Sequence, residues 1–220
     1  MEWITKIVCT TVMISASGAL SPGPLTIATF SLGSRYGWRS GFLVAVGHTI
    51  AELFYIVFLF YFFSLAEAIL KGLTGDILSV FGATLVLFFA LSSIREGLLG
   101  LKHGKAFHVS TSTSSLKNPI VVGILFTGLN IWFLVWWLSI GIDLISLATK
   151  AGFIGIPVLF LSHIWLDYLW LCLVAEAGRR GRQIMDTKSY SILILALGII
   201  LAVFGINMVI KRFTPYAILP

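Results

Sequence analysis

Hydrophobic positions along the chain gather into six long runs that short polar segments separate. A transmembrane helix needs about 20 predominantly apolar residues. Each run reaches that length, at about 7–33, 41–66, 77–99, 120–147, 152–177 and 190–210. A membrane β-barrel would instead show segments of about ten residues with alternating hydrophobicity. The pattern therefore predicts an all-α integral membrane protein with six transmembrane helices, a multi-pass protein of the cell membrane.

The composition is typical of a chain that lies in lipid. Hydrophobic residues make up 58% of the sequence and charged residues 11%, whereas soluble domains carry about 25% charged residues. Most lysines and arginines stand between the apolar runs, and nucleic-acid binding would need them clustered on one face. The two cysteines form no CxxC pair, which argues against a disulfide framework, a zinc site and a dithiol relay. We expect no cofactor, no resident metal and no nucleic-acid partner.

Lysine and arginine are distributed unevenly over the two sides of the predicted bundle. Ten of the 15 lie on the side of the segments 34–40, 100–118 and 178–189, and five lie on the opposite side. Such residues favour the cytoplasmic side, so these three loops are predicted to be cytoplasmic and both termini to lie outside. Arg95 and Lys211 stand at span ends, where we expect their side chains to reach toward water.

The second and fifth runs share a motif, a histidine followed four residues later by an acid. His48 and Glu52 form the first pair, and His163 and Asp167 form the second, 115 residues later for both members. The third and sixth runs match at nearly the same offset, since Gly82 corresponds to Gly198, 116 residues on. A register shared by two pairs of runs indicates an internal duplication.

Three spans in each half make the duplication an inverted one. An odd number of crossings gives the second copy the opposite orientation, as in many secondary transporters, whose sites lie between the halves. The predicted organisation is a first three-helix repeat at 1–100, a polar cytoplasmic loop at 101–118 and a second repeat at 119–220. Cleavage of the N-terminus as a signal peptide is disfavoured, because losing residues 1–20 would remove one span and break this symmetry.

The paired histidines and acids are the strongest candidates for chemistry. Residues four apart share one face of a helix, and at a rise of 1.5 Å per residue both pairs fall near the middle of their spans. An ionisable group there costs several kcal/mol and usually marks a functional site. The alternative is that each carboxylate only binds its own histidine and fixes helix packing. If functional, such a pair could pass protons near neutral pH or bind an ammonium group, and the sequence leaves both roles open.

The first run contains the residues Ser21-Pro22-Gly23-Pro24, which should break a helix. Proline removes a backbone donor and glycine adds conformational freedom. A broken helix exposes a half-helix N-terminus, whose partial positive charge attracts a carboxylate. Pro22 and Pro24 suit the first turn of a new half-helix, with Ser21 as its N-cap. In the fourth run, the nearest match for such a break is the sequence around Asn130, which has no proline.

These motifs resemble those of the LysE-type (lysine exporter) family of amino-acid exporters. "SPGPLTIATFSLGSRYGWRSGFLVAVGHTIAE" is similar to that family's signature, with Pro-Gly-Pro, a basic glycine-rich turn and a glycine-led second helix. "SHIWLDYLW" is similar to the family's fifth helix, and "GLN" at 128–130 stands where the family tends to have Asn-Pro. The resemblance implies a six-helix exporter driven by the proton gradient, with Pro-Gly-Pro at 22–24 and Asn130 as paired helix breaks. The chain departs from the family at Ile131, where that proline is absent.

Two functions remain open on these grounds, and a third is disfavoured. The first is export of amino acids or related small zwitterions and cations by proton antiport, with Glu52 or Asp167 meeting the substrate's ammonium group. The alternative is export of a divalent metal ion, because two histidines and two carboxylates can ligate one. An intramembrane enzyme is disfavoured, since nothing in the sequence supplies an oxyanion hole. The expected partners are the substrate, protons and the lipid bilayer, and a homodimer is left open.

Overall fold

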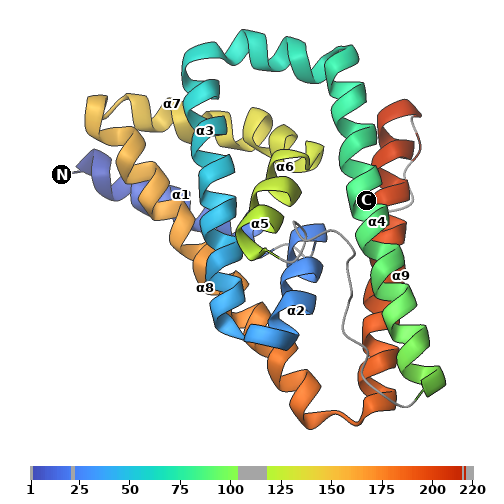
Figure 1. Cartoon of the computed structure of the whole chain (residues 1–220). Coiled ribbons are helices and arrows are strands. Elements are labelled where there is room, and N and C mark those ends of the chain that lie inside the picture. The colour runs from blue at the N-terminus through green and yellow to red at the C-terminus, as the bar shows by residue number, and fades with distance from the viewer. Residues whose placement is uncertain (1, 21–22, 104–117, 215, 217–220) are drawn as a thin grey trace.

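The computed structural model describes residues 2–20, 23–103, 118–214 and 216. Ser21, Pro22 and most of the loop predicted at 101–118 lie outside this set. The described residues form helices and short connections (Figure 1). In chain order the helices are α1 (Glu2–Ala19), α2 (Pro24–Tyr36), α3 (Trp38–Lys71), α4 (Leu73–His103), α5 (Pro119–Gly128), α6 (Ile131–Trp136), a π-helix (Trp137–Gly141), α7 (Ile142–Thr149), a short 3-10 helix (Gly152–Ile154), α8 (Gly155–Ile184) and α9 (Thr187–Phe213).

Four helical segments are long and apolar enough to cross a membrane. They are Trp38–Phe62, Leu73–Lys102, Gly152–Ile184 and Thr187–Phe213, which correspond to the second, third, fifth and sixth apolar runs. The backbone of Phe62 leaves the helical region, with φ −133° and ψ 40°. Beyond this kink the end of α3 runs across the top of the molecule in Figure 1. These segments and the apolar composition agree with a multi-pass membrane protein.

The first and fourth apolar runs are divided into shorter helices. α1 and α2 cover the first run with a gap after Ala19, and α5, α6, the π-helix and α7 cover the fourth. In Figure 1, α1 and α7 extend to the left of the bundle, away from α4 and α9. Neither run therefore forms one continuous helix.

The connections between helices are shorter than the sequence pattern predicts. α8 continues to Ile184, so the expected loop at 178–189 shrinks to Met185 and Asp186. The polar residues there stay helical because Glu176 pairs, three and four residues on, with Arg179 and Arg180, and such pairs support a helix.

At the other predicted turn, 34–40, a single residue separates α2 from α3. That residue is Gly37, whose φ of 60° suits glycine because side chains with a Cβ rarely adopt it. A Cβ at Gly37 would lie 2.7 Å from Cδ of Arg179. The turn therefore lies directly against α8.

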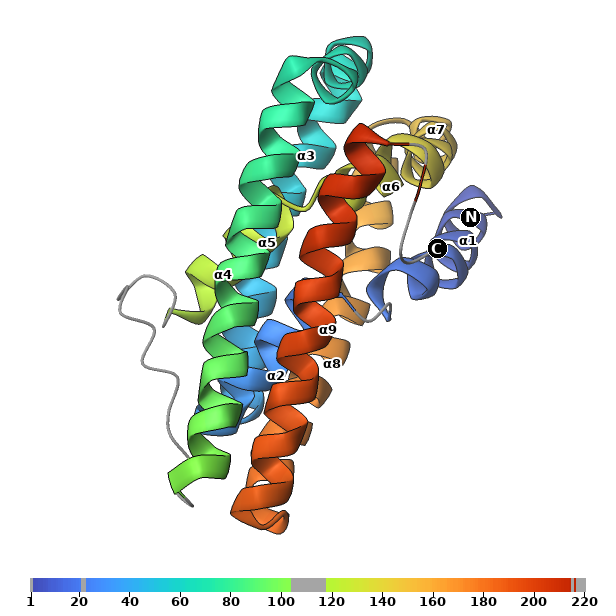
Figure 2. The same ribbon diagram turned by 90° about the vertical axis from the view of Figure 1, so that its right-hand side faces the viewer.

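Helix packing joins elements from the two halves of the chain. α4 packs along α9, α3 along α5, and α8 against both α1 and α2. Figure 2 shows α4 and α9 side by side over their lengths. The helices before residue 104 thus pack mainly against those after residue 117.

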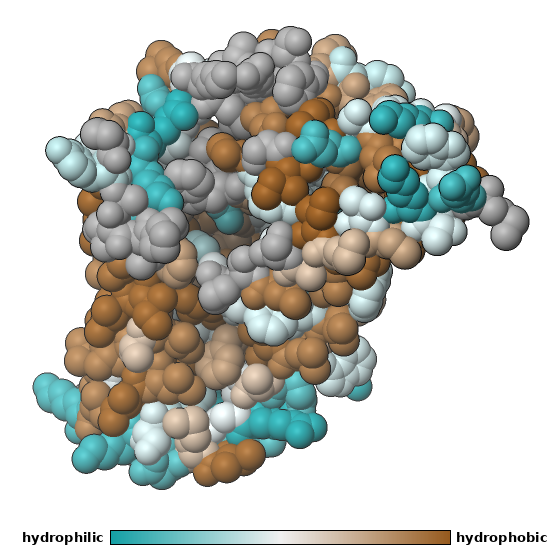
Figure 3. Space-filling model, turned by 180° about the vertical axis from the view of Figure 1, so that it is seen from behind, coloured by the Kyte–Doolittle hydropathy of each residue, from teal (hydrophilic) through white to brown (hydrophobic). Residues whose placement is uncertain are grey.

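Apolar side chains also cover much of the outer surface. Exposed examples are Phe54 at 75%, Tyr61 at 70% and Leu161 at 68%. In Figure 3 hydrophobic residues form a broad band across the rear face, and hydrophilic residues gather toward the ends. Such a band is unfavourable in water and suits contact with lipid tails.

Candidate functional site

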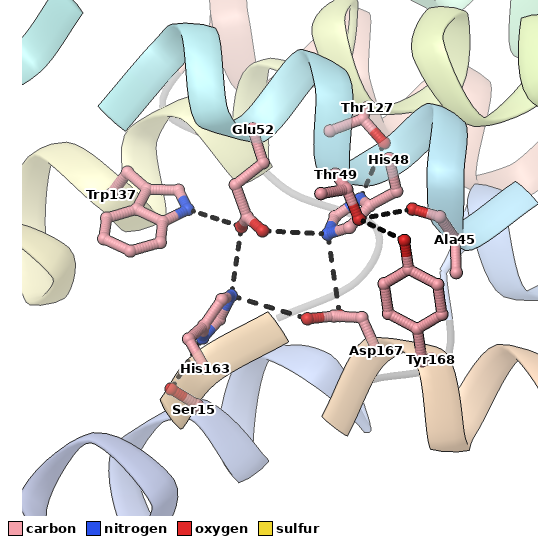
Figure 4. A network of polar contacts seen from close by, with 10 residues as sticks. All are labelled: Ser15, Ala45, His48, Thr49, Glu52, Thr127, Trp137, His163, Asp167 and Tyr168. Carbon is pink, nitrogen blue, oxygen red and sulfur yellow. Dashed lines mark hydrogen bonds and ion pairs between the residues drawn. The ribbon is translucent and has the colours of Figure 1, made fainter. Parts of the chain in front are cut away.

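Four side chains from the two histidine–acid motifs meet between α3 and α8 (Figure 4). Nε2 of His48 lies 3.4 Å from Oε2 of Glu52 and 3.6 Å from Oδ1 of Asp167. Nε2 of His163 lies 3.0 Å from Oε1 of Glu52 and 3.5 Å from Oδ2 of Asp167. Histidines and acids thus alternate around a closed ring, called here the His–carboxylate ring. Each acid contacts the histidine of its own motif and that of the other motif.

Hydroxyl groups hold the outer nitrogen of each histidine. Nδ1 of His48 lies 2.8 Å from Oγ1 of Thr127 on α5. Nδ1 of His163 lies 2.6 Å from Oγ of Ser15 on α1. A hydroxyl can donate or accept a hydrogen bond, so each contact is compatible with a neutral or a protonated imidazole. The ring can therefore change its protonation without losing these two anchors.

Trp137 supplies a further anchor from the fourth apolar run. Its Nε1 donates a hydrogen bond to Oε1 of Glu52 at 3.0 Å, and its ring lies edge-on to His163 with centroids 5.2 Å apart. Trp137 is the first residue of the π-helix, a geometry that is frequent at functional sites. A Cβ at Gly141 would lie 2.3 Å from Cε3 of Trp137. Glycine at 141 therefore makes room for the indole.

The ring is almost completely withdrawn from solvent. Glu52 is 0% exposed, His48 and His163 are 4% exposed and Asp167 is 6% exposed. Buried charges are costly unless they are paired, and here two acids face two imidazoles. Some of the ring's hydrogen-bonding capacity is unused, because Nε2 of His48, Oε2 of Glu52 and Oδ2 of Asp167 make no hydrogen bond with the described residues. The ring therefore has room for a further donor, acceptor or cation.

A cavity of about 380 Å³ adjoins the ring. Its walls come from the gap between α1 and α2, from the gap between α5 and α6, from α3 and α8, and from the end of α9. Aromatic side chains are prominent among them. The described lining residues are Gly18, Ala19, Gly23, Pro24, Leu25, Thr26, His48, Glu52, Asn130, Phe133, Trp136, Trp137, His163, Asp167, Trp170, Leu171, Phe204, Asn207, Met208 and Lys211.

The gap after α1 brings a helix N-terminus to this cavity. Pro24 is the first residue of α2, and the N-cap is Gly23, in extended conformation with φ −147° and ψ −175°. The expectation that Ser21 is the N-cap is therefore wrong, because proline's fixed φ suits the first helical position and places the cap one residue before Pro24. Because the N-cap is glycine, the cap residue itself offers no side chain to the first N–H groups of α2. The N–H groups of Leu25 and Thr26 belong to its first turn, and both residues line the cavity.

Asn130 lies in the gap between α5 and α6 and also lines the cavity. Its Oδ1 accepts a hydrogen bond from the backbone N–H of Phe133 at 3.4 Å, as an N-cap does. Asn130 therefore has a structural role even though Ile131 replaces the proline typical of the family.

The structure thus brings most of the sequence-predicted site residues to one cavity. His48, Glu52, His163 and Asp167 form the ring, and Gly23 and Asn130 from the two gaps line the same space. Ser21 and Pro22 lie outside the described residues.

Several contributors carry no distinctive signal in the sequence. Ser15 and Thr127 are single hydroxyls in apolar runs, and only their place beside the histidines reveals them. Lys211, which we expected to reach toward water, is half-buried and lines the cavity as well.

Comparisons with known proteins agree with the motifs. The family model described as LysE type translocator matches residues 16–212, which is nearly the whole chain. No curated protein matches, and no solved structure matches.

Proposed function

The chain belongs to the LysE type translocator family, and on that premise we propose that it exports amino acids or related small zwitterions and cations from the cytoplasm in exchange for protons. The observation that carries this proposal is the buried His–carboxylate ring beside a 380 Å³ cavity. A transporter, unlike an enzyme, needs only a site that binds cargo and an ion in turn. The ring and the cavity have the features of such a site.

The ring suits both protons and an ammonium group. Two acids and two imidazoles offer several arrangements of protons, and the unused acceptors of Glu52 and Asp167 could receive an N–H donor. A cationic ammonium group and an extra proton carry the same charge, so the ring cannot hold both at low cost in a low-dielectric site. Competition of this kind makes substrate binding release a proton. That release is the exchange step of an antiporter.

The N-terminus of α2 suits the substrate's carboxylate. Its N-cap is a glycine without a capping side chain, and the helix dipole favours negative charge there. The described part of the Pro-Gly-Pro break, Gly23 and Pro24, lies on the cavity wall. We propose that the break between α1 and α2 is the hinge and the carboxylate-binding end of the site.

Alternating access would follow from an inverted repeat of two three-helix halves. The packing supports this proposal, because α3 lies on the broken run of the second half and α8 lies on that of the first. The hydroxyl contacts of the two histidines also cross between the halves, since His48 contacts Thr127 and His163 contacts Ser15. We propose that the broken runs complete a six-span bundle whose halves rock around the ring.

Export of a divalent metal ion is the second candidate, and one observation favours it. His48, Glu52 and Asp167 each offer a ligand atom, and these atoms lie within 4.8 Å of one another. A metal would draw them to about 2–2.2 Å from one point, which requires the more distant of these atoms to move closer together. The largely apolar and aromatic remainder of the cavity has no use in that mechanism, so we rank it second.

An export assay with a substrate panel separates the two candidates. Cells that make the protein should release particular amino acids faster than cells that make Glu52→Gln, while their tolerance of toxic divalent metals stays unchanged. Metal tolerance that depends on His48, without any release of amino acids, would support the second candidate and overturn the first.

A further inference from the structure

The last three turns of α9 form a cavity wall that the His–carboxylate ring does not use. Phe204, Asn207, Met208 and Lys211 line the cavity, and their spacing of three, four and seven residues places them on one face of the helix. This wall carries one cationic side chain and one amide. An amide N–H and an ammonium group are both hydrogen-bond donors.

The neighbouring arginine is engaged elsewhere. Nε of Arg212 lies 2.6 Å from Oδ1 of Asp76, and its Nη2 donates to the carbonyl oxygen of Gly72 at 3.1 Å. These bonds tie the end of α9 to the start of α4. They fix the helix face on which Lys211 meets the cavity.

Most side chains of the remaining cavity wall are apolar, and several are aromatic. Phe133, Trp136, Trp170 and Phe204 contribute rings to it. Among the described lining residues the acids are Glu52 and Asp167, which already face the two histidines of the ring. A second cationic group on a substrate would therefore meet aromatic walls and the charge of Lys211, with no further acid among these residues to balance it.

We propose that Lys211, together with Asn207, binds the substrate's carboxylate and makes the site selective for amino acids with uncharged, apolar or aromatic side chains over basic ones. This inference rests on the proposed export of amino acids. Lys211 places its charge on a flexible four-carbon stem, so it supplements the partial charge at the N-terminus of α2. The aromatic walls then receive the apolar side chain, whose burial is favourable.

Paired ligands test the inference without any mutation. Phenylalanine and phenethylamine differ by the carboxylate, and phenylalanine and lysine differ in the side chain. Purified protein should bind phenylalanine about ten- to a hundredfold more tightly than phenethylamine, the range expected for a charge-assisted hydrogen bond. It should bind lysine more weakly than phenylalanine. Equal binding of phenylalanine and phenethylamine, or tighter binding of lysine, would overturn the inference.

Variants then assign the preference to one side chain. Lys211→Gln should weaken phenylalanine binding about ten- to a hundredfold and leave phenethylamine binding nearly unchanged. Lys211→Arg should restore most of the preference. Lys150→Gln is the matched control, because Lys150 is an exposed lysine outside the cavity lining, and it should behave as the wild type.

The outcomes separate this inference from the proposed function. If Lys211→Gln keeps the wild-type preference for phenylalanine while the wild type exports amino acids, the inference fails and the proposed function stands. If the wild type binds and exports no amino acid, both fail. If Lys211→Gln does not fold, Lys211→Met removes the same charge and is compared with the wild type on the same three ligands.

Discussion

Replacing Glu52 with glutamine removes one negative charge from the ring and almost nothing else. Glutamine has nearly the same size, and its carbonyl oxygen can still accept the hydrogen bond that Trp137 donates at 3.0 Å. The contact with His163 at 3.0 Å loses its ionic character. Glu52 is 0% exposed, so solvent water does not compensate for the loss of its charge. The variant should therefore report on charge rather than on packing.

The size of the effect follows from the hydrogen bonds that the charge makes. A hydrogen bond to a charged group contributes about 1.5–3 kcal/mol, which corresponds to about a ten- to hundredfold change in affinity. We expect Glu52→Gln to weaken amino-acid binding by about this factor. We also expect substrate binding to release markedly fewer protons, because one of the two carboxylates no longer titrates.

Both quantities can be measured in weakly buffered detergent solution with a pH-sensitive dye. Substrate titration gives the dissociation constant and the protons released per substrate bound. Asp143→Asn is the matched control, since it makes the same chemical change on an exposed carboxylate outside the cavity lining. Wild-type proton release and affinity in Glu52→Gln would refute the reasoning that the ring exchanges a proton for an ammonium group.

Three further predictions address the supports of the ring and the orientation of the chain. Ser15→Ala and Thr127→Ala each remove a hydrogen bond of about 1 kcal/mol from a histidine. Each variant should therefore slow proton-driven transport about fivefold in a transport assay. Very unequal effects of the two variants would argue against the symmetric arrangement. Gly141→Ala should destabilise the protein by about 1–3 kcal/mol through overpacking against the indole of Trp137. Gly128→Ala should leave the thermal unfolding midpoint unchanged, because a Cβ there meets nothing within 4 Å. Equal midpoints for the two variants would refute the role of Gly141. A reporter fused to the C-terminus should be accessible from outside intact cells, and access only from the cytoplasm would overturn the predicted orientation.

The sequence predicted the two histidine–acid pairs of the ring because their signal is one of register. His48 and His163 each precede an acid by four residues, and the 115-residue offset relates the two motifs. Helical spacing alone indicates that each pair shares a face. That the two faces meet depends on how α3 and α8 pack, which a single sequence does not reveal.

The signal for the second helix break is weaker in the sequence. Asn130 caps α6 through a bond to the N–H of Phe133, which a search for proline does not detect. Ser15 and Thr127 were missed because hydroxyls in membrane helices often bond to their own backbone. For Lys211 the sequence predicted only a side chain that reaches toward water, as a lysine near a span end usually does. Only the tertiary arrangement shows that the end of α9 borders a cavity.

Proton movement across a sealed membrane tests the central proposal most directly. Purified protein in liposomes, with a pH-sensitive dye inside, is given an amino-acid panel under a pH gradient. The proposal predicts that at least one amino acid moves against its gradient while protons flow the opposite way, and that Glu52→Gln abolishes the proton flow. Failure of every amino acid in the panel to move protons through the wild-type protein would contradict it.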